Sequence, residues 1–294
     1  MMMFASIGPG LPQDLFAATG RYRGPIGWDT DRPTPAAGQW LESKFSTWAR
    51  LVLEEWAAGA FDDLELVVFS RADDTAQRLY YYVCELQRAG TLKGPEPVLL
   101  DIAKIPRPSS EDHTIAGVRK LAERLGVGGY ALEQAIFATN LQRRAPRDEA
   151  GGRVCLLAGS PPPDRRLHIA IEAAGFSALG TTLGALWRDP GPLVEEGTDD
   201  PIAAVGRQLH GWPDDQRGFG DKAAAVVEQA TANAARAAVL WYTEEDEARV
   251  WHVPAIRAAL AAAEVPTCIL ARRDWTARDG AADEIRDFLN GISA

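Results

Sequence analysis

Short apolar runs alternate along the chain with longer stretches in which apolar residues recur at helical spacing. A run that is apolar at consecutive positions predicts a strand buried on both faces, since a strand with one wet face alternates instead. We predict such strands at 64–70, 96–103, 153–159, 236–242 and 265–272. Strands that alternate with helices are typical of α/β folds, in which helices flank parallel sheets.

The stretches with helical spacing lie between these runs and beside them. We predict helices at about 40–59, 74–89, 111–125, 130–144, 163–174, 221–234, 253–263 and 280–291. Asp164 and Asp221 precede two of the helices and suit N-cap positions, whereas Gly90 and Gly126 suit helix ends.

The stretch RRAPRDEAGGR, residues 143–153, is charged, contains glycine and runs directly into a predicted strand. Composition of this kind indicates a boundary between domains. We therefore expect an N-terminal α/β domain over 1–148, which includes the linking helices, and a C-terminal α/β domain over 149–294.

The two halves repeat one arrangement, because 64–89 and 236–263 each run from a strand through an acidic turn into a helix. Ligands of open α/β sheets bind outside the carboxyl ends of the strands. Both acidic turns fall at such positions. We expect the functional site there, in a cleft between the two domains.

The charge of the chain narrows the classes of partner. A formal net charge of −10 and a pI near 5.0 argue against binding to nucleic acid or an anionic membrane. No apolar run approaches the roughly 20 residues that span a bilayer, and the N-terminus lacks the features of a signal peptide. We expect a cytoplasmic protein.

Cysteine and histidine offer little chemistry. Cys84, Cys155 and Cys268 are scattered within apolar runs, which is typical of small buried residues rather than of metal ligands. The motifs of serine, cysteine and zinc hydrolases do not occur. Of the four histidines, His252 is the one near an acidic strand end. It is a candidate general acid or base, or simply a partly exposed residue at a helix start.

Carboxylates dominate the two strand ends. Asp73 and Asp74 follow one strand, and the turn 244–247, which contains Glu245 and Asp246, follows the other. Carboxylates here are able to act as general acids or bases or to bind a hard cation. They also suit capping positions at helix starts, which is the structural alternative.

A further turn, GSPPPD, begins with Gly159 and Ser160 and lies between a strand and a helix. Backbone amides at such a place are able to receive a phosphate, including that of CoA. Three prolines remove three of these donors, so a plain proline-rich helix start is the alternative.

The order of segments resembles the D-component subunits of the 2-hydroxyacyl-CoA dehydratase and benzoyl-CoA reductase family. The resemblance covers almost the whole chain. Its clearest segments are GLPQDLFAATGRYRGPI, FSTWARLVLEEW, VVFSRADDTAQRL, ALEQAIFATNLQRR, RVCLLAGSPPPDRRLHIAIEAAG and VLWYTEEDEARVWHVPAIRAALAAAEVPTCIL. It implies two Rossmann-like domains, an acyl-CoA substrate, pairing with a related subunit, and a 4Fe-4S cluster held by three cysteines at the domain interface.

This chain departs from the family at the cluster. The three cysteine positions match Ser46, Ala72 and Asp246, the last within one residue. Alanine is no ligand, and serine and aspartate are poor ones for a site that prefers thiolates. We therefore expect no metal or cluster here. We expect a polar cleft instead, in which Arg50 and Arg71 neutralise aspartates. The expected cleft residues are Arg50, Ser70, Arg71, Asp74, Gly159, Ser160 and Glu245.

Three functions follow from this interpretation, and it stays open whether the protein is an enzyme. The first is a non-redox subunit that binds an acyl-CoA or supports a related dehydratase-type subunit. The second is a lyase that adds or removes water on a CoA thioester with Asp73, Asp246 and His252 as acid and base groups. The third is a conventional 4Fe-4S dehydratase subunit. The expected partner is a related subunit or a second copy of the chain.

Overall fold

The computed structural model describes residues 2–145, 152–212 and 220–292. The chain forms two compact units, and each is assembled from two segments. Of the described residues, 2–145 and 187–212 form the first unit, and 152–186 and 220–292 form the second. The boundary expected after residue 148 lies outside the described residues. The chain also returns to the first unit after residue 186. The expected division at one boundary is therefore too simple, because each unit contains two segments.

The sheet of the first unit has four strands that all run parallel, in the order β2-β1-β3-β4. These strands are β1 (Met3–Ile7), β2 (Tyr22–Pro25), β3 (Leu64–Ser70) and β4 (Glu96–Leu100). This strand order is that of flavodoxin-like sheets, which are related to the Rossmann fold.

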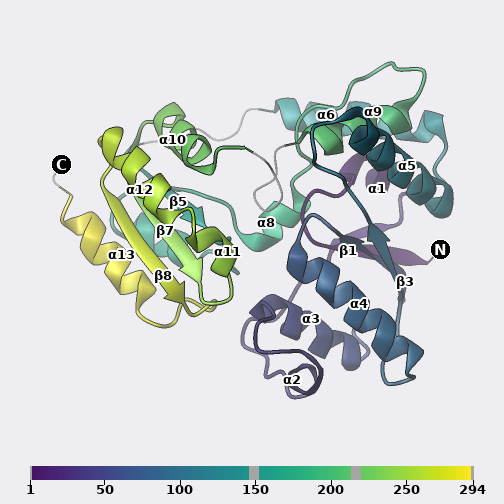
Figure 1. The fold of residues 1–294 in the computed structure, drawn as a ribbon, viewed down its shortest axis with the longest axis horizontal. Coiled ribbons are helices and arrows are strands. Elements are labelled where there is room, and N and C mark those ends of the chain that lie inside the picture. Colours follow the sequence, from purple (N-terminus) through teal and green to yellow (C-terminus); the bar gives the residue numbers. More distant parts are fainter. Residues whose placement is uncertain (1, 146–151, 213–219, 293–294) are drawn as a thin grey trace. The chain divides into compact units, whose positions relative to one another are not determined.

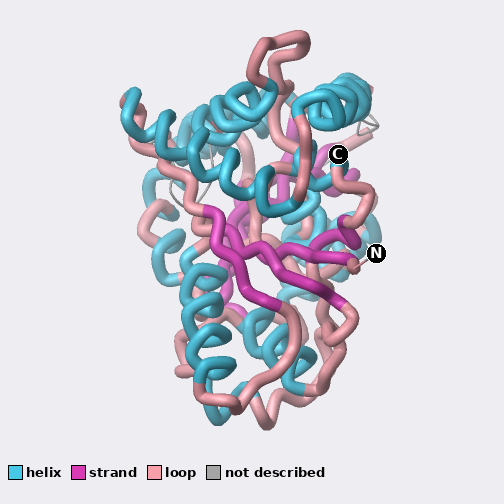
Figure 2. The backbone as a smooth tube through the Cα atoms, turned by 90° about the vertical axis from the view of Figure 1, so that its right-hand side faces the viewer, coloured by secondary structure: helices cyan, strands magenta, loops and turns pink. Residues whose placement is uncertain are grey.

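One face of this sheet is covered by α1 (Gln13–Ala18), α5 (Pro108–Leu125), α6 (Gly129–Arg144) and α9 (Pro201–Gly211). Their apolar residues join those of β1, β3 and β4 in one buried cluster. Helix α9 belongs to the returning segment and packs against α5 and α6. Figure 2 shows the strands between helices on either side.

The opposite face carries α2 (Ala37–Trp40), α3 (Thr47–Ala57) and α4 (Asp74–Arg88) (Figure 1). Phe69 of β3 points to this side, where its ring lies 6.2 Å from the ring of Trp56 and 5.7 Å from that of Tyr80. Since neighbouring strand residues point to opposite faces, Val68 joins the cluster on the other face.

Arg143, which forms a buried ion pair within segment 2–145, also ties the returning segment to it. The Arg143 guanidinium donates to both carboxylate oxygens of Asp14, at 2.8 and 2.7 Å, and to the carbonyl oxygens of Pro190 and Gly191. Asn140, one helical turn earlier, accepts from the guanidinium at 2.9 Å. The charges are almost fully buried, and these hydrogen bonds offset part of their desolvation cost.

The second unit repeats the strand order of the first. Its parallel sheet has the order β6-β5-β7-β8. These strands are β5 (Val154–Gly159), β6 (Ser177–Leu179), β7 (Ala235–Thr243) and β8 (Thr267–Arg273). The chain is thus an α/β protein with two four-stranded parallel sheets flanked by helices, and this confirms the expected fold class.

Helices α10 (Lys222–Ala232) and α12 (Val253–Ala262) pack together over one face of the second sheet and share a buried cluster with β7. Helices α7 (Arg166–Ala173) and α13 (Ala281–Asn290) form another packed pair. The short helix α11 (Glu247–Val250) follows β7, and α8 (Leu183–Arg188) lies where the chain returns to the first unit.

The pattern of apolar residues located all five predicted strands, with shifts of up to three residues at their ends. The helix expected over 40–59 is instead two helices, interrupted at 41–46. Asp221 caps α10 as predicted, whereas the cap position of α7 is Arg165. In the part of the chain that the structure describes, no helix is both long and apolar enough to cross a membrane.

Candidate functional site

Each sheet has a point where the chain changes direction, between β1 and β3 in the first unit and between β5 and β7 in the second. Crevices at the carboxyl ends of such strand pairs are the usual ligand sites of open α/β sheets. The acidic turns that the sequence singled out, after β3 and after β7, lie at these points.

In the first unit, the turns after β1 and β3 are closely packed. Gly8 has φ = +98°, and a Cβ on it would lie 2.8 Å from the Cβ of Ser70. The fully buried Ser70 hydroxyl accepts a hydrogen bond from the amide of Ala72 at 3.0 Å. Ser70 therefore holds the turn after β3 in shape.

Asp73 is the N-cap of α4. Its carboxylate accepts from the amide of Ala76 at 2.7 Å, and the residue is 5% exposed. Asp74 is exposed in the first turn of the same helix, where the helix dipole favours a negative charge. These contacts fit the structural alternative considered for both carboxylates.

Arg71 contacts an acidic residue that the sequence pattern did not single out. Its guanidinium pairs with Asp101, which directly follows β4, and Asp101 also lies 3.1 Å from Nε2 of His113 on α5. Arg71 was expected to neutralise a neighbouring aspartate. The ion pair that it forms is with Asp101 instead, since β4 lies beside β3 and its carboxyl end is within reach.

Two positions in this unit, which the resemblance matches to cluster cysteines, make contacts within the protein. Ser46 Oγ lies 3.1 Å from Oγ1 of Thr75 in the first turn of α4. Ala72 is 1% exposed. Arg50, also expected to neutralise an aspartate, donates to the carbonyl oxygen of Glu42 at 3.0 Å.

In the second unit, the structure brings together three predicted residues. Gly159 has φ = +109°, and a Cβ there would overlap the carbonyl oxygen of Trp241 in the neighbouring strand. Ser160 follows, and its hydroxyl donates to Asp246 at 2.7 Å and accepts from the amide of Thr243 at 3.2 Å. The close approach of β5 to β7 therefore places the serine hydroxyl against the acidic turn.

Asp246 has a second partner, which the sequence analysis missed. Arg249, three residues later on α11, donates to the same carboxylate oxygen at 2.9 Å. The Nε of Arg249 is buried without a hydrogen-bond partner. Acid and base three residues apart on a helical turn are neighbours, so this spacing was a usable signal. Glu245 lies half-buried beside Asp246.

The other predicted features of this edge are less promising. The amide of Ser160 donates to the carbonyl of Trp241 at 2.8 Å, and the next three residues are prolines without amide hydrogens. The turn therefore offers few amides to a phosphate, which fits the plain helix start better. His252 is exposed at the N-cap position of α12.

The side chains at the positions that the resemblance matches to the cluster cysteines do not fit a 4Fe-4S cluster. They comprise a serine bonded to Thr75, a buried alanine and an aspartate that is paired with Arg249. Thiolates usually hold such clusters. Among the described residues, no group of three or more histidine, cysteine or acidic side chains is placed to hold a metal ion.

The cysteines lie elsewhere in the two units, on α4, β5 and β8. Burial raises the pKa of Cys155 to about 12, and it also raises the pKa of Cys84 and of Cys268. Raised pKa values keep these thiols protonated at neutral pH. They are therefore weak nucleophiles at neutral pH, because the thiolate is the reactive form.

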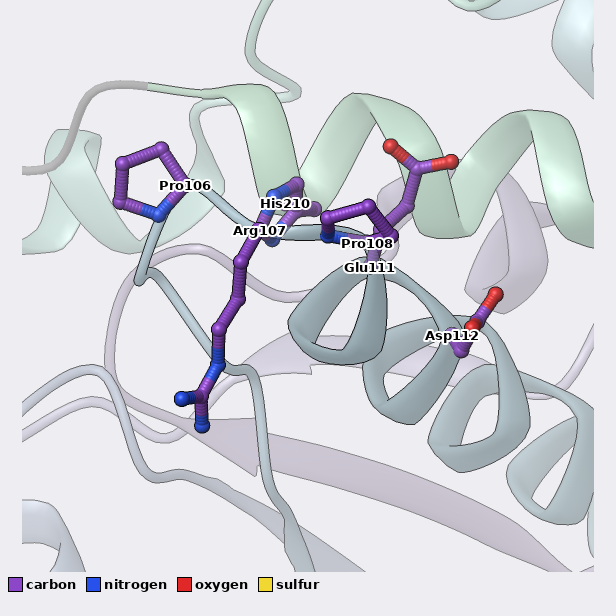
Figure 3. Close-up of a pocket in the computed structure, with 6 residues that line it drawn as sticks. All are labelled: Pro106, Arg107, Pro108, Glu111, Asp112 and His210. Carbon is purple, nitrogen blue, oxygen red and sulfur yellow. The ribbon is translucent and has the colours of Figure 1, made fainter.

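A separate pocket of about 390 Å³ lies on the first unit at the start of α5. Figure 3 shows its lining of two prolines, Arg107, His210 and two acidic residues. His210 Nδ1 lies 2.7 Å from the carbonyl oxygen of Ala103, and Arg107 Nε donates to Ser110 at 3.2 Å. No predicted site residue is among the six that line it.

Comparison with known proteins adds no identification. No protein-family model matches the chain, and a search of the curated proteins finds no match. The fold class is therefore established by the two parallel sheets, while the function is argued from the residues at their carboxyl edges.

Proposed function

We propose that the protein is a clusterless, non-redox relative of the 2-hydroxyacyl-CoA dehydratase subunits. In this proposal it binds a CoA thioester or supports a related subunit that keeps its cluster. One observation carries the non-redox part: the positions that match the cluster cysteines hold Ser46, Ala72 and Asp246, whose side chains are bonded or buried within the protein. Because these side chains are bonded or buried within the protein, they favour a cluster site that other residues have replaced over a cluster site that has only lost its metal.

The second unit supplies the better surface for a ligand. The turn after β3 is closed by Ser70 and capped by Asp73, so its polar groups hold the backbone. The turn after β7 instead joins three side chains, those of Ser160, Asp246 and Arg249. Side chains that bond one another at a strand end are able to exchange partners with a polar ligand.

The first experiment tests whether the protein holds an iron-sulfur cluster. The full chain is purified without oxygen, and its iron, acid-labile sulfide and visible spectrum are measured. We expect no stoichiometric iron and no broad visible absorption. A brown protein with about four irons per chain would overturn the proposal, because it would show the ligand set of a conventional cluster.

The second experiment tests CoA binding by calorimetry, with acetyl-CoA and with free CoA as probes. We expect binding that weakens at least about tenfold in Arg249→Gln, which corresponds to about 1.4 kcal/mol. Arg257→Gln, an exposed arginine on α12, is the matched control. Co-purification with a related subunit that retains its cysteines tests the supporting role. Failure of both measurements would contradict the proposal.

A second candidate function, acid and base catalysis on a CoA thioester, is favoured by one contact. The Asp246 carboxylate accepts from the Ser160 hydroxyl at 2.7 Å, so it already acts as a hydrogen-bond acceptor at the edge of the sheet. Turnover of crotonyl-CoA by the isolated chain would support this candidate if Asp246→Asn abolished it. Asp287→Asn, at an exposed residue on α13, is the matched control. The absence of turnover would exclude this reaction.

A further inference from the structure

Helix α6 carries apolar residues on two opposite faces. Leu132 and Ile136 are buried with no exposed surface, on the side that packs against α1 and α9. Tyr130, Phe137 and Leu141 are 82%, 51% and 53% exposed on the outer side. Single exposed apolar residues are ordinary, but several on one helix face mark an interaction surface.

The outer residues form a regular line, which we call the α6 stripe and define as Tyr130, Gln134, Phe137 and Leu141. Their spacing of four, three and four residues is that of the seam along which two helices pair. Small residues flank the line, since Ala138 is exposed beside Phe137.

The stripe is also free of charge. Every exposed position from residue 129 to residue 142 is uncharged. Glu133, at the margin of this face, is held by the amide of Gly197 at 2.5 Å. Helix α5, of similar length, instead exposes Asp112, Lys120 and Glu123.

We propose that the α6 stripe is the contact between two copies of this chain, paired antiparallel about a two-fold axis at Phe137. Copies with a net charge of −10 repel one another, so they meet most easily where neither surface is charged. Phe137 lies at the middle of α6, and a two-fold axis is the usual symmetry of homodimers.

The antiparallel direction follows from the ends of the helix. An axis at Phe137 sets Tyr130 of one copy opposite Arg144 of the other, whose guanidinium pairs with Glu196 at 2.8 Å and meets the exposed ring as part of that ion pair. The positive end of each helix dipole then lies beside the negative end of its neighbour. A parallel pair would place Arg144 against Arg144.

The area of the contact sets its expected strength. A helix of 16 residues is about 24 Å long, and one pair of such helices buries less than the roughly 1,200 Å² of a small stable interface. We therefore expect a reversible dimer with a dissociation constant on the order of micromolar.

Sedimentation velocity of the full chain from about 1 µM to about 100 µM tests this. We expect a concentration-dependent dimer and at least about a 100-fold weaker association in Phe137→Glu, because two charges would face each other at the axis. Ile169→Glu places the same charge at a 58% exposed position on α7 and should leave association unchanged. Circular dichroism of both variants confirms that they are folded.

Crosslinking tests the direction. Phe137→Cys should form a disulfide with its own copy, while Tyr130→Cys should crosslink to Arg144→Cys in a mixture and not to itself. The wild-type chain, with its buried or half-buried cysteines, gives the background. A monomer at every concentration, a dimer unaffected by Phe137→Glu, or self-crosslinking of Tyr130→Cys would overturn the proposal. If the stripe binds only a related subunit, the isolated chain would stay monomeric at every concentration, which is the first of these results.

Discussion

The two units share a strand order and differ in what their acidic turns do. In the first unit, Asp73 is 5% exposed and its carboxylate caps a helix. In the second, Asp246 is half-buried and is bonded by Ser160 and Arg249. A carboxylate that caps a helix contributes to the stability of that helix, whereas one held by side chains is able to change partners. The comparison indicates that similar acidic turns at equivalent strand ends are not equivalent sites.

The units also differ in how they are held together. In the first unit, the Arg143 guanidinium pairs with Asp14 and holds the segment 187–212 by donating to the carbonyl oxygens of Pro190 and Gly191. In the second unit, the tight approach of Gly159 to Trp241 sets the position of the candidate site. Changes at these places should therefore affect one unit at a time, and hydrogen exchange is able to report which one.

Arg143→Met should have the largest effect, because it leaves the carboxylate of Asp14 buried without its cation. We expect a loss of about 3 to 5 kcal/mol in the free energy of unfolding. The faster hydrogen exchange should appear in α1, α6 and the returning segment. Arg144→Met, which removes a half-exposed partner of Glu196, should cost less than about 1 kcal/mol. Equal losses in the two variants would contradict the importance of the buried pair.

Gly159→Ala should destabilise the second unit by about 2 to 4 kcal/mol. The new Cβ would overlap the carbonyl oxygen of Trp241, and φ = +109° is strained for alanine. Gly175→Ala, with φ = +81° and no atom within 4 Å of the added Cβ, carries backbone strain alone and is the control. Urea denaturation of both variants, with exchange measured in β5 and β7, separates the clash from the strain. A similar cost in both would refute a close approach.

Asp73→Ala and Asp246→Ala test the difference between the two turns directly. The first removes a buried helix cap and should cost about 1 to 2 kcal/mol of stability. The second removes a partly exposed ion pair and should cost about 1 kcal/mol or less. Ligand binding, measured with acetyl-CoA, should fall in Asp246→Ala and remain in Asp73→Ala. The reverse pattern would move the site to the first unit.

Acid should weaken the second unit through His168, which is 2% exposed on α7. Burial lowers the pKa of His168 below its usual 6.5. The unfolded chain therefore binds a proton at a higher pH than the folded chain, so stability falls as the pH drops below 6.5. The slope is at most about 1.4 kcal/mol per pH unit for one proton. Denaturation at several pH values should show this slope, and His168→Phe should remove it.

The outcome for the strands shows what a local pattern is able to predict. The five strands found from apolar runs are five to nine residues long, and β3, β5 and β7 among them are mostly buried. The strands β1, β2 and β6 have five, four and three residues, and the pattern of apolar runs did not indicate them. Strands β2 and β6 lie at the edges of their sheets, where fewer neighbours bury a strand, whereas β1 is buried between β2 and β3 but has only five residues.

The candidate site was predicted in part. Gly159, Ser160 and Asp246 were chosen because they follow strands, and the second unit brings them together. The positions of the strand ends did not predict which charged residues pair with one another. Arg71 pairs with Asp101, 30 residues later in the chain, and no local spacing indicates a contact of that kind.

The sequence by itself determined the fold class, most of the strands and helices, and the strand ends where polar groups gather. Periodicity and helix caps depend on neighbouring residues, so the chain displays them before it folds. Only the tertiary structure decided that residues 187–212 return to the first unit, that Asp73 is a buried cap, and that Asp246 joins Ser160 across 86 residues. Those features depend on which strands lie side by side, and that is settled by the burial of the whole chain rather than by any one segment.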